Sequence, residues 1–493
     1  MNQEQSRFVI LPDTRKATAT LIIALALTVL PPRRSQAADS LDTKFMYYQE
    51  DKNRIRVLAP EFSLQDESDS GWIIKLDGIY NAITGATPTG APPSAPAPVT
   101  SIQPPSSPAS SGGGGSTTAA APPPVAPTPP PRVTPPRDEN DAMIARSINY
   151  PAAMYSAVTA ATPVAAPPPV TTPSSAPSAP ASSPGSSSSS GGSSSGSSSS
   201  GGGQSSTTQP ASQPSSSRIP LAKFHDARWA FNIGLSKRID DHTPGIQGSY
   251  SQESDYISTG ISLQDAIDFN KKNTTFAVGG AYTHDTLNPA NGRPSATKDS
   301  LDAIIGISQV LTKTTVLNAN FTLGQVTGFI SDPYKLVELN GALTYEKRPD
   351  SKNKQIAYIG LQQFITPLDA SIDLGVRYYT DSFGITAETL SLSWFQKVSP
   401  EIVISPIIRY YTQTAASFYD VRFSGSPDFY SSDYRISNMS ALSYGIKVIW
   451  TPSADLRFDA GVERYQLSGN DGKTDPEMYP SALLFIVGAH FAF

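Results

Sequence analysis

Apolar and polar residues alternate over short stretches through most of the C-terminal half of the chain. The final stretch, residues 482–493, shows the pattern most clearly. Its first set of positions is Leu483, Phe485, Val487, Ala489, Phe491 and Phe493, and its second set is Leu484, Ile486, Gly488, His490 and Ala492. Successive side chains of a β-strand point to opposite faces. The pattern therefore predicts a strand with one wholly apolar face and one face that becomes small and polar towards its end.

The same alternation recurs in earlier stretches of the chain. They include residues 72–81, 228–236, 276–282, 317–324, 372–379 and 442–450. The apolar face often ends in Trp or Tyr, as is typical of strands that cross a membrane interface. The opposite face carries Gly, Ser, Asn and charges, which is too polar for the dry core of a soluble sandwich. The chain is therefore predicted to be all-β, a transmembrane antiparallel β-barrel with a wet lumen.

The connections between these stretches alternate in length. Short turns such as 240–244 and 399–401 separate longer links such as 285–300 and 412–437. Outer-membrane barrels have short periplasmic turns and long external loops. Counting back from the last strand gives about 16 strands. An additional pair near Tyr334–Tyr345 would make eighteen, and an N-terminal pair outside the wall would leave fourteen.

The chain divides into four segments by composition. Residues 1–37 have basic residues, an apolar run and a small-x-Ala site, which predict a secretory signal peptide. Residues 38–83 are expected to supply the N-terminal barrel strands, and residues 219–493 the main part of the barrel. Between them, residues 84–218 are rich in Pro, Ser and Gly and are expected to form a disordered insert. By the parity of the strands, this insert is an external loop.

Composition narrows the possible chemistry. The chain has no cysteine, which excludes thiol catalysis and Cys-ligated metal sites, and its net charge of −5 suggests no nucleic-acid partner. No cofactor, metal or catalytic residue is assigned. Glu253 and Asp255 belong to a group of carboxylates at predicted outer tips, where solvated loop charge and a calcium site are alternatives. The adjacent pair His284-Asp285 leaves a hydrolase at the rim of the barrel as an alternative function.

Two similar strings mark the candidate lumen site. Arg377-Tyr378-Tyr379 and Arg409-Tyr410-Tyr411 occupy equivalent places on two strands that run in the same direction. In each string, one Tyr is predicted to face lipid, and the other joins its Arg inside. The side chains then either form part of the aromatic girdle with hydrogen bonds in the lumen, or form a constriction that favours anions or polar solutes. Further inward-facing candidates are Arg228, Lys447, Asp459 and Glu463, whose mixed signs also allow an ion-pair network across the lumen.

Several strings together resemble the signature of an uncharacterised family of bacterial outer-membrane barrels, a domain of unknown function. They are residues 81–88, 251–256, 273–275, 377–381 and 409–411, with Ala415-Ala416 and Phe418-Tyr419. The resemblance covers about residues 41–90 and 219–493, and Asn81 stands where Asp is expected. It implies a barrel in the outer membrane of a Gram-negative bacterium, in contact with lipid and lipopolysaccharide. It assigns no substrate.

The terminal aromatics Phe491 and Phe493 also resemble the assembly signal of such barrels, which the barrel assembly machinery recognises. The function expected from the sequence is a channel or passive transporter for an unknown solute. The alternatives are a plugged barrel that acts as a scaffold for a surface or periplasmic protein, and the rim hydrolase.

Overall fold

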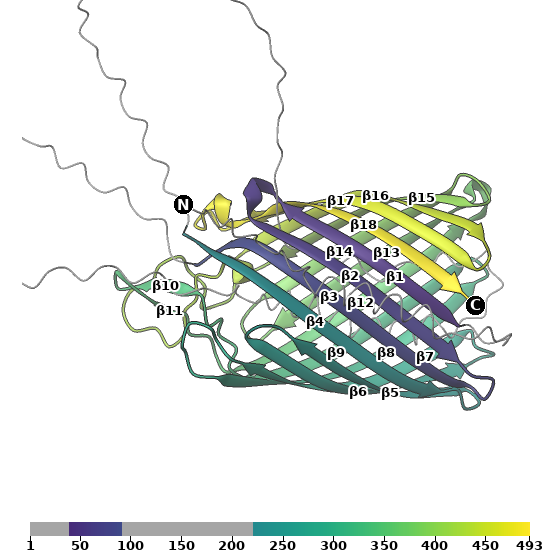
Figure 1. The fold of residues 1–493 in the computed structure, drawn as a ribbon, viewed down its shortest axis with the longest axis horizontal. Helices are drawn as coiled ribbons and strands as arrows, with labels where there is room; N and C mark the ends of the chain where they lie inside the picture. The colour runs from purple at the N-terminus through teal and green to yellow at the C-terminus, as the bar shows by residue number, and fades with distance from the viewer. Residues whose placement is uncertain (1–38, 91–219) are drawn as a thin grey trace, which may run out of the picture.

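A computed structural model describes residues 39–90 and 220–493. Sixteen of its strands form one closed antiparallel barrel, and β10 and β11 form a separate two-stranded sheet (Figure 1). The predicted fold class and the strand number are therefore confirmed, and the hairpin near Tyr334–Tyr345 lies outside the wall. In the described ranges, none of the helices has the length and apolar character needed to cross a membrane. The expected signal peptide and most of the expected insert lie outside the described residues.

The strand bounds are as follows. The barrel strands are β1 (Ser40–Glu50), β2 (Ile55–Glu67), β3 (Trp72–Pro88), β4 (Leu221–Lys237), β5 (His242–Gln252), β6 (Tyr256–Phe269), β7 (Thr274–Leu287), β8 (Ala296–Thr312), β9 (Thr315–Gly328), β12 (Ser351–Ile365), β13 (Ala370–Asp381), β14 (Thr386–Lys397), β15 (Ile402–Gln413), β16 (Met439–Ser453), β17 (Leu456–Gly469) and β18 (Ser481–Ala492). The separate hairpin consists of β10 (Leu336–Leu339) and β11 (Ala342–Tyr345), and short 3-10 helices are η1 (Asp51–Asn53), η2 (Thr366–Leu368), η3 (Tyr434–Ile436) and η4 (Pro476–Met478).

The first and last strands close the barrel. β1 pairs with β18 in an unbroken antiparallel register from Ser40↔Ala492 to Glu50↔Ala482. The backbone N–H of Phe493 donates to the carbonyl oxygen of Asp39 at 3.1 Å, so the last residue extends this seam. β3 continues past the expected boundary at residue 83 and pairs with β4 as far as Pro88↔Leu221. The strand continues because residues 84–88 precede the Pro-rich composition and find partners in β4.

The two faces of the wall follow the predicted alternation. Large apolar side chains on the outward face are strongly exposed, among them Ile233 (62%), Leu263 (59%), Ile359 (58%) and Val487 (50%). Ser, Gly, Asn and charged residues occupy the inward positions of the same strands. A continuous exposed apolar surface of this kind needs an apolar surrounding. The barrel is therefore of the outer-membrane type.

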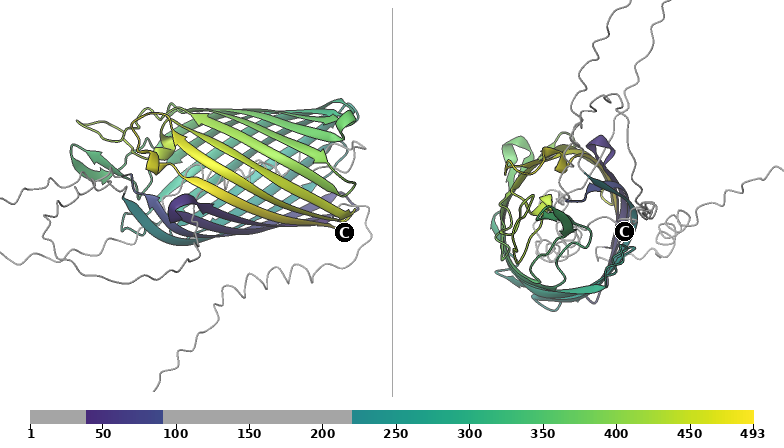
Figure 2. Two further views of the ribbon diagram at one scale, coloured as in Figure 1. Left: turned by 90° about the horizontal axis from the view of Figure 1, so that it is seen from above. Right: turned by 90° about the vertical axis from the view of Figure 1, so that its left-hand side faces the viewer.

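The two ends of the barrel differ. At the end where the chain terminates, strands are joined by short turns such as residues 270–273 (Figure 1). The longer loops and the β10–β11 hairpin lie at the other end, which we call the loop end. Seen from there, the strands form a ring, and part of the loops lies within its outline (Figure 2). β3 and β4 also meet at the loop end, where the N–H of Thr89 donates to the carbonyl oxygen of Pro220.

Candidate functional site

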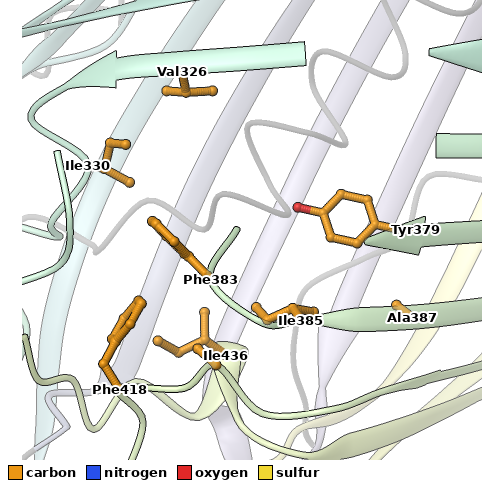
Figure 3. Close-up of a cluster of buried hydrophobic side chains, with 9 residues drawn as sticks. Val326, Ile330, Tyr379, Phe383, Ile385, Ala387, Phe418 and Ile436 are labelled. Atoms are coloured by element: carbon orange, nitrogen blue, oxygen red, sulfur yellow. The ribbon is translucent and has the colours of Figure 1, made fainter. Parts of the chain in front are cut away.

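The long loops pack into a folded roof at the loop end of the barrel. The roof consists of residues 329–350 and 414–438, together with the β13–β14 turn and residues 470–480. Its apolar centre contains Ile330, Phe383, Phe418 and Ile436, all at most 8% exposed (Figure 3). The rings of Phe383 and Phe418 meet edge to face with 4.9 Å between centroids. The loops are therefore held by a small core of their own.

Six charged residues are buried in the two long loops of the roof. They are Asp332, Lys335, Glu346, Arg348, Asp433 and Arg435, each at most 7% exposed. Asp433 lies at their centre, where it accepts hydrogen bonds from Arg435 and, at 2.8 Å, from Arg348, and where Lys335 lies 3.8 Å away. Arg435 also reaches Asp332 at 2.8 Å. With three acids and three bases, the cluster is neutral overall, as burial in a low-dielectric region requires.

The ionisation of this cluster depends on its internal pairing. Burial alone raises the pKa of Asp433, but Arg435, Lys335 and Arg348 outweigh it and hold the pKa below the usual range. Burial raises the pKa of Glu346, and Arg348 only partly offsets this effect. Burial lowers the pKa of Lys335 despite the nearby carboxylates. The three neighbouring cations thus stabilise the ionised form of the Asp433 carboxylate in the folded roof.

A central segment, residues 332–336, connects the roof to the rest of the mouth. The ammonium of Lys335 donates to the carbonyl oxygen of Pro88 at 2.7 Å. The backbone N–H of Leu336 donates to the carbonyl oxygen of Thr89 at 2.9 Å. The Tyr334 hydroxyl donates to Asp255 in the β5–β6 turn. These contacts join the loop after β9 to strand ends three and six steps away in the ring, β6 and β3, so the roof reaches over the mouth from the edge of the wall.

The repeated strings are placed as predicted with respect to the two faces. Tyr378 and Tyr410 point outward and are 45% and 49% exposed, whereas Tyr379 is 7% exposed and faces inward. Arg377 is paired in register with Thr389, and Arg409 with Ser391, on the intervening strand β14. Both arginines lie on the lumen face and are within electrostatic reach of each other.

The inward tyrosines have a bracing role that the sequence did not reveal. The Tyr379 hydroxyl donates to Asp381 at 2.7 Å, and Asp381 accepts the N–H groups of Phe383 and Ile385 in the roof. In the second string, Tyr411 donates in the same way to Gln413 at 2.5 Å. The Gln413 amide donates in turn to backbone oxygens of residues 435 and 437. Each string therefore fixes a roof element as well as lining the lumen.

The other inward candidates lie flat against the wall. Glu463 lies over Gly445, Lys447 over Gly461 and Asp459 over Gly488, because the glycines leave room beside them. The Arg228 guanidinium donates to Ser251 at 2.8 Å and lies 3.8 Å from Glu253. Ion pairs on this face, such as Lys44–Glu61 at 3.0 Å and Lys354–Asp302 at 2.9 Å, join strands that are close in the ring. They are wall pairs and not contacts across the lumen.

The adjacent residues His284 and Asp285 are separated by the wall. His284 faces outward, with Nδ1 2.8 Å from Asp299 Oδ1. Asp285 faces inward, is fully buried and lies 3.7 Å from the Lys298 ammonium. The alternation of strand side chains puts the two on opposite faces. This His and this Asp are therefore not oriented towards a common substrate.

The carboxylates at the β5–β6 turn do come together. Glu253 and Asp255 join Asp226, which the sequence analysis had not singled out, with ligand oxygens within 4.8 Å of one another. Asp226 accepts the N–H groups of Ala227 and Ser254. Arg228 lies 3.8 Å from Glu253, and the Tyr334 hydroxyl donates to Asp255, so each of the three acids has a donor or cation from the protein beside it.

The sequence offered one signal for the roof. The loops carry Ile330, Tyr334, Phe418 and Ile436, which are more apolar than solvated loops usually are. The buried charges had no such signal, because Lys335, Arg348 and Arg435 read as ordinary surface residues. Their partners are distant in sequence, and no periodicity relates them.

Comparison with known proteins identifies the family. A family model described as "Protein of unknown function (DUF3570)" matches residues 15–300 and 294–483. Among solved structures, the siderophore receptor PirA from Pseudomonas aeruginosa is 8% identical, with a TM-score of 0.36 and coverage of 88% of this chain and 57% of that one. A ferric enterobactin receptor (PfeA) mutant from Pseudomonas aeruginosa is also 8% identical, with a TM-score of 0.38 and coverage of 92% and 60%.

CdiB from Acinetobacter baumannii is 10% identical, with a TM-score of 0.33 and coverage of 54% of this chain and 57% of that one. This chain thus spans less than two thirds of the length of these structures. No match was found among the curated proteins. Because the family model covers well over half of the sequence, the chain belongs to this family of unknown function, and its fold is a 16-stranded outer-membrane-type β-barrel.

Proposed function

We propose that the protein is a channel or passive transporter in the outer membrane of a Gram-negative bacterium, with its roof on the outer side. The observation that carries this proposal is the placement of Arg377 and Arg409 on the lumen face of a polar wall. Strands in a sheet lie about 4.8 Å apart, so the two strands that carry these residues are about 10 Å apart. Both guanidinium groups stay charged at physiological pH. Their local positive field favours anions in dilute electrolyte.

A planar-bilayer recording of the purified protein tests this proposal. The wild type is expected to conduct, with anion preference that is strongest at low salt, since the Debye length is about 10 Å at 0.1 M. Arg377→Ala/Arg409→Ala should move the reversal potential towards cation preference. Arg377→Lys/Arg409→Lys keeps both charges and serves as the matched control. A conducting double-alanine variant with wild-type selectivity would contradict the role of the arginines.

The roof favours a second candidate function. A mouth spanned by a buried, mutually paired loop network also suits a closed barrel that presents loops to a surface or periplasmic protein. A well-folded wild-type barrel that stays silent in the bilayer supports this scaffold and not the channel.

The outward face of the barrel and its last strand suggest two kinds of partner. Lipid and lipopolysaccharide are the proposed surroundings of the outward apolar face. The proposed contact with the barrel assembly machinery is the last strand, where Phe491 and Phe493 lie on the outward face beside the seam.

A further inference from the structure

Two lumen glycines occupy matching positions between an acid and a lysine. Gly324 on β9 is paired in register with Asp302 on β8 and with Lys354 on β12. Gly488 on β18 is paired in register with Asp459 on β17 and with Lys44 on β1. In ring order, seven strand-to-strand steps separate β18 from β9 in one direction and nine in the other. The two rows therefore lie on opposite walls of the barrel.

The space above Gly324 is filled by the ion pair itself. Asp302 and Lys354 are two strand spacings apart, about 10 Å, yet Lys354 Nζ lies 2.9 Å from Asp302 Oδ1. They meet because the side chains of Asp302 and Lys354 extend towards each other across Gly324 on β9. A Cβ at position 324 would overlap both Lys354 Cε and Asp302 Oδ1. The contact thus depends on the missing side chain.

The row at Gly488 shares the position of the acid but not the ion pair over the glycine. A Cβ there would lie 2.7 Å from Asp459 Oδ1, so this carboxylate also rests on the glycine. Lys44, on the other side of Gly488, extends to Glu61 on β2 at 3.0 Å. Charges in this row are directed along the wall and not towards the axis of the lumen.

We propose that Gly324 and Gly488 are positioning residues: Gly324 keeps Asp302 and Lys354 flat against the wall, and Gly488 does the same for Asp459. The solute path then stays wide, and the Asp302–Lys354 and Lys44–Glu61 pairs each cancel within the wall, so that the field of Arg377 and Arg409 sets ion preference. The part of this inference that concerns solutes rests on the proposed channel. The part that concerns side-chain placement does not.

The first test measures placement without any current. In the folded wild-type barrel in detergent, Lys354 should react slowly with a water-soluble amine-acylating reagent, because its side chain is 10% exposed. Gly324→Ala displaces the flexible ends of Lys354 and Asp302, so acylation of Lys354, followed by mass spectrometry, should rise severalfold. Gly306→Ala is the matched control: a Cβ at this lumen glycine would lie 3.5 Å from the Ala319 oxygen and Asn320 Cβ and 4.0 Å from Ala277 Cβ, all ordinary contacts. Equal Lys354 reactivity in the wild type and Gly324→Ala would overturn the inference.

The second test measures ion preference and avoids any substitution that crowds the wall. Asp302→Asn removes the negative charge 2.9 Å from Lys354 Nζ and should shift the reversal potential towards anions, whereas Lys354→Gln should shift it towards cations. Asp302→Asn/Lys354→Gln should return to the wild-type value. If the double variant keeps the shift in reversal potential of either single variant, then the charges of Asp302 and Lys354 do not cancel each other. A silent wild type would instead refute the channel, and the acylation result would still decide the placement.

Discussion

The ammonium of Lys335 donates a hydrogen bond of 2.7 Å to the carbonyl oxygen of Pro88, although 247 positions separate the two residues in sequence. Lys335 is fully buried and also lies 3.8 Å from Asp433. One side chain thus links the end of β3 to both long loops of the roof. The stability of the roof should therefore respond to changes at Lys335 far more than that of the barrel wall.

Lys335→Met keeps the length of the side chain but removes both contacts. The Pro88 oxygen then loses its donor, while Asp433 keeps Arg348 and Arg435, so we expect the roof to lose about 1–3 kcal/mol. Limited proteolysis should show faster cleavage within residues 329–350 and 414–438. Lys473→Met is the control, because the Lys473–Asp420 pair is largely exposed and should matter little. Equal cleavage in both variants would contradict the bridging role.

Acid should loosen the roof before it loosens the barrel. A carboxylate whose folded pKa is depressed contributes stability above its ordinary pKa, and this contribution is lost as the pH falls through the folded value. Asp433 is such a group, with an ordinary pKa of 3.8. Glu346 has a raised pKa, so it is protonated at a higher pH than Asp433, and its buried site favours the protonated form. Pepsin cleavage of the roof should therefore increase as the pH is lowered below about 4, with heat-modifiable migration retained; a roof equally resistant at all acidic pH values would refute this.

Charge should be tolerated on the two faces of the wall to different degrees. Ile446 points outward and is 46% exposed, whereas Asn320 lies on the lumen face between Gly306 and Tyr358. Ile446→Arg should destabilise the barrel by about 2–4 kcal/mol if it lies near the bilayer midplane. Asn320→Arg should cost much less. Unfolding by urea in lipid vesicles measures both, and equal losses would indicate a dry interior.

The last residue should matter for closure. Phe493 is 44% exposed on the outward side, and its N–H donates to Asp39 across the seam. Phe493→Asp should reduce the amount of heat-modifiable barrel in the outer membrane, because it puts a charge on the lipid-facing end of the closing strand. Phe493→Tyr keeps an aromatic ring and should assemble normally. Normal assembly of the Asp variant would show that the terminal ring is dispensable.

The barrel was predictable because its signal is local and repeated. The alternation of apolar and polar residues predicted which side chains face outward, including the opposite placement of Tyr378 and Tyr379. The positions of the turns predicted the number of strands in the barrel. Of the two ambiguous stretches, the N-terminal strands join the wall, whereas residues 334–345 form two short strands in the separate β10–β11 sheet. Only tertiary contacts decide whether such a hairpin joins the wall.

The roof was not predictable for the opposite reason. Its contacts pair residues such as Asp332 and Arg435, 103 positions apart, and no spacing in the sequence relates them. The repeated Arg-Tyr-Tyr strings were found, but the anchoring roles of Asp381 and Gln413 depend on where the loops fold. The lumen ion pairs likewise depend on which strands are neighbours in the ring.

The seam also sets the order in which the molecule can form. Most wall pairings join strands that are consecutive in the chain and can form as hairpins, but β1 and β18 bring together residues such as Asp42 and His490, which are 448 positions apart. Contacts of such range form slowly. Until the final strand arrives, the growing sheet has two unpaired edges that invite association with other chains. Closure is therefore the vulnerable step in biogenesis, and a nascent chain that lacks its last strand is an open sheet prone to aggregation.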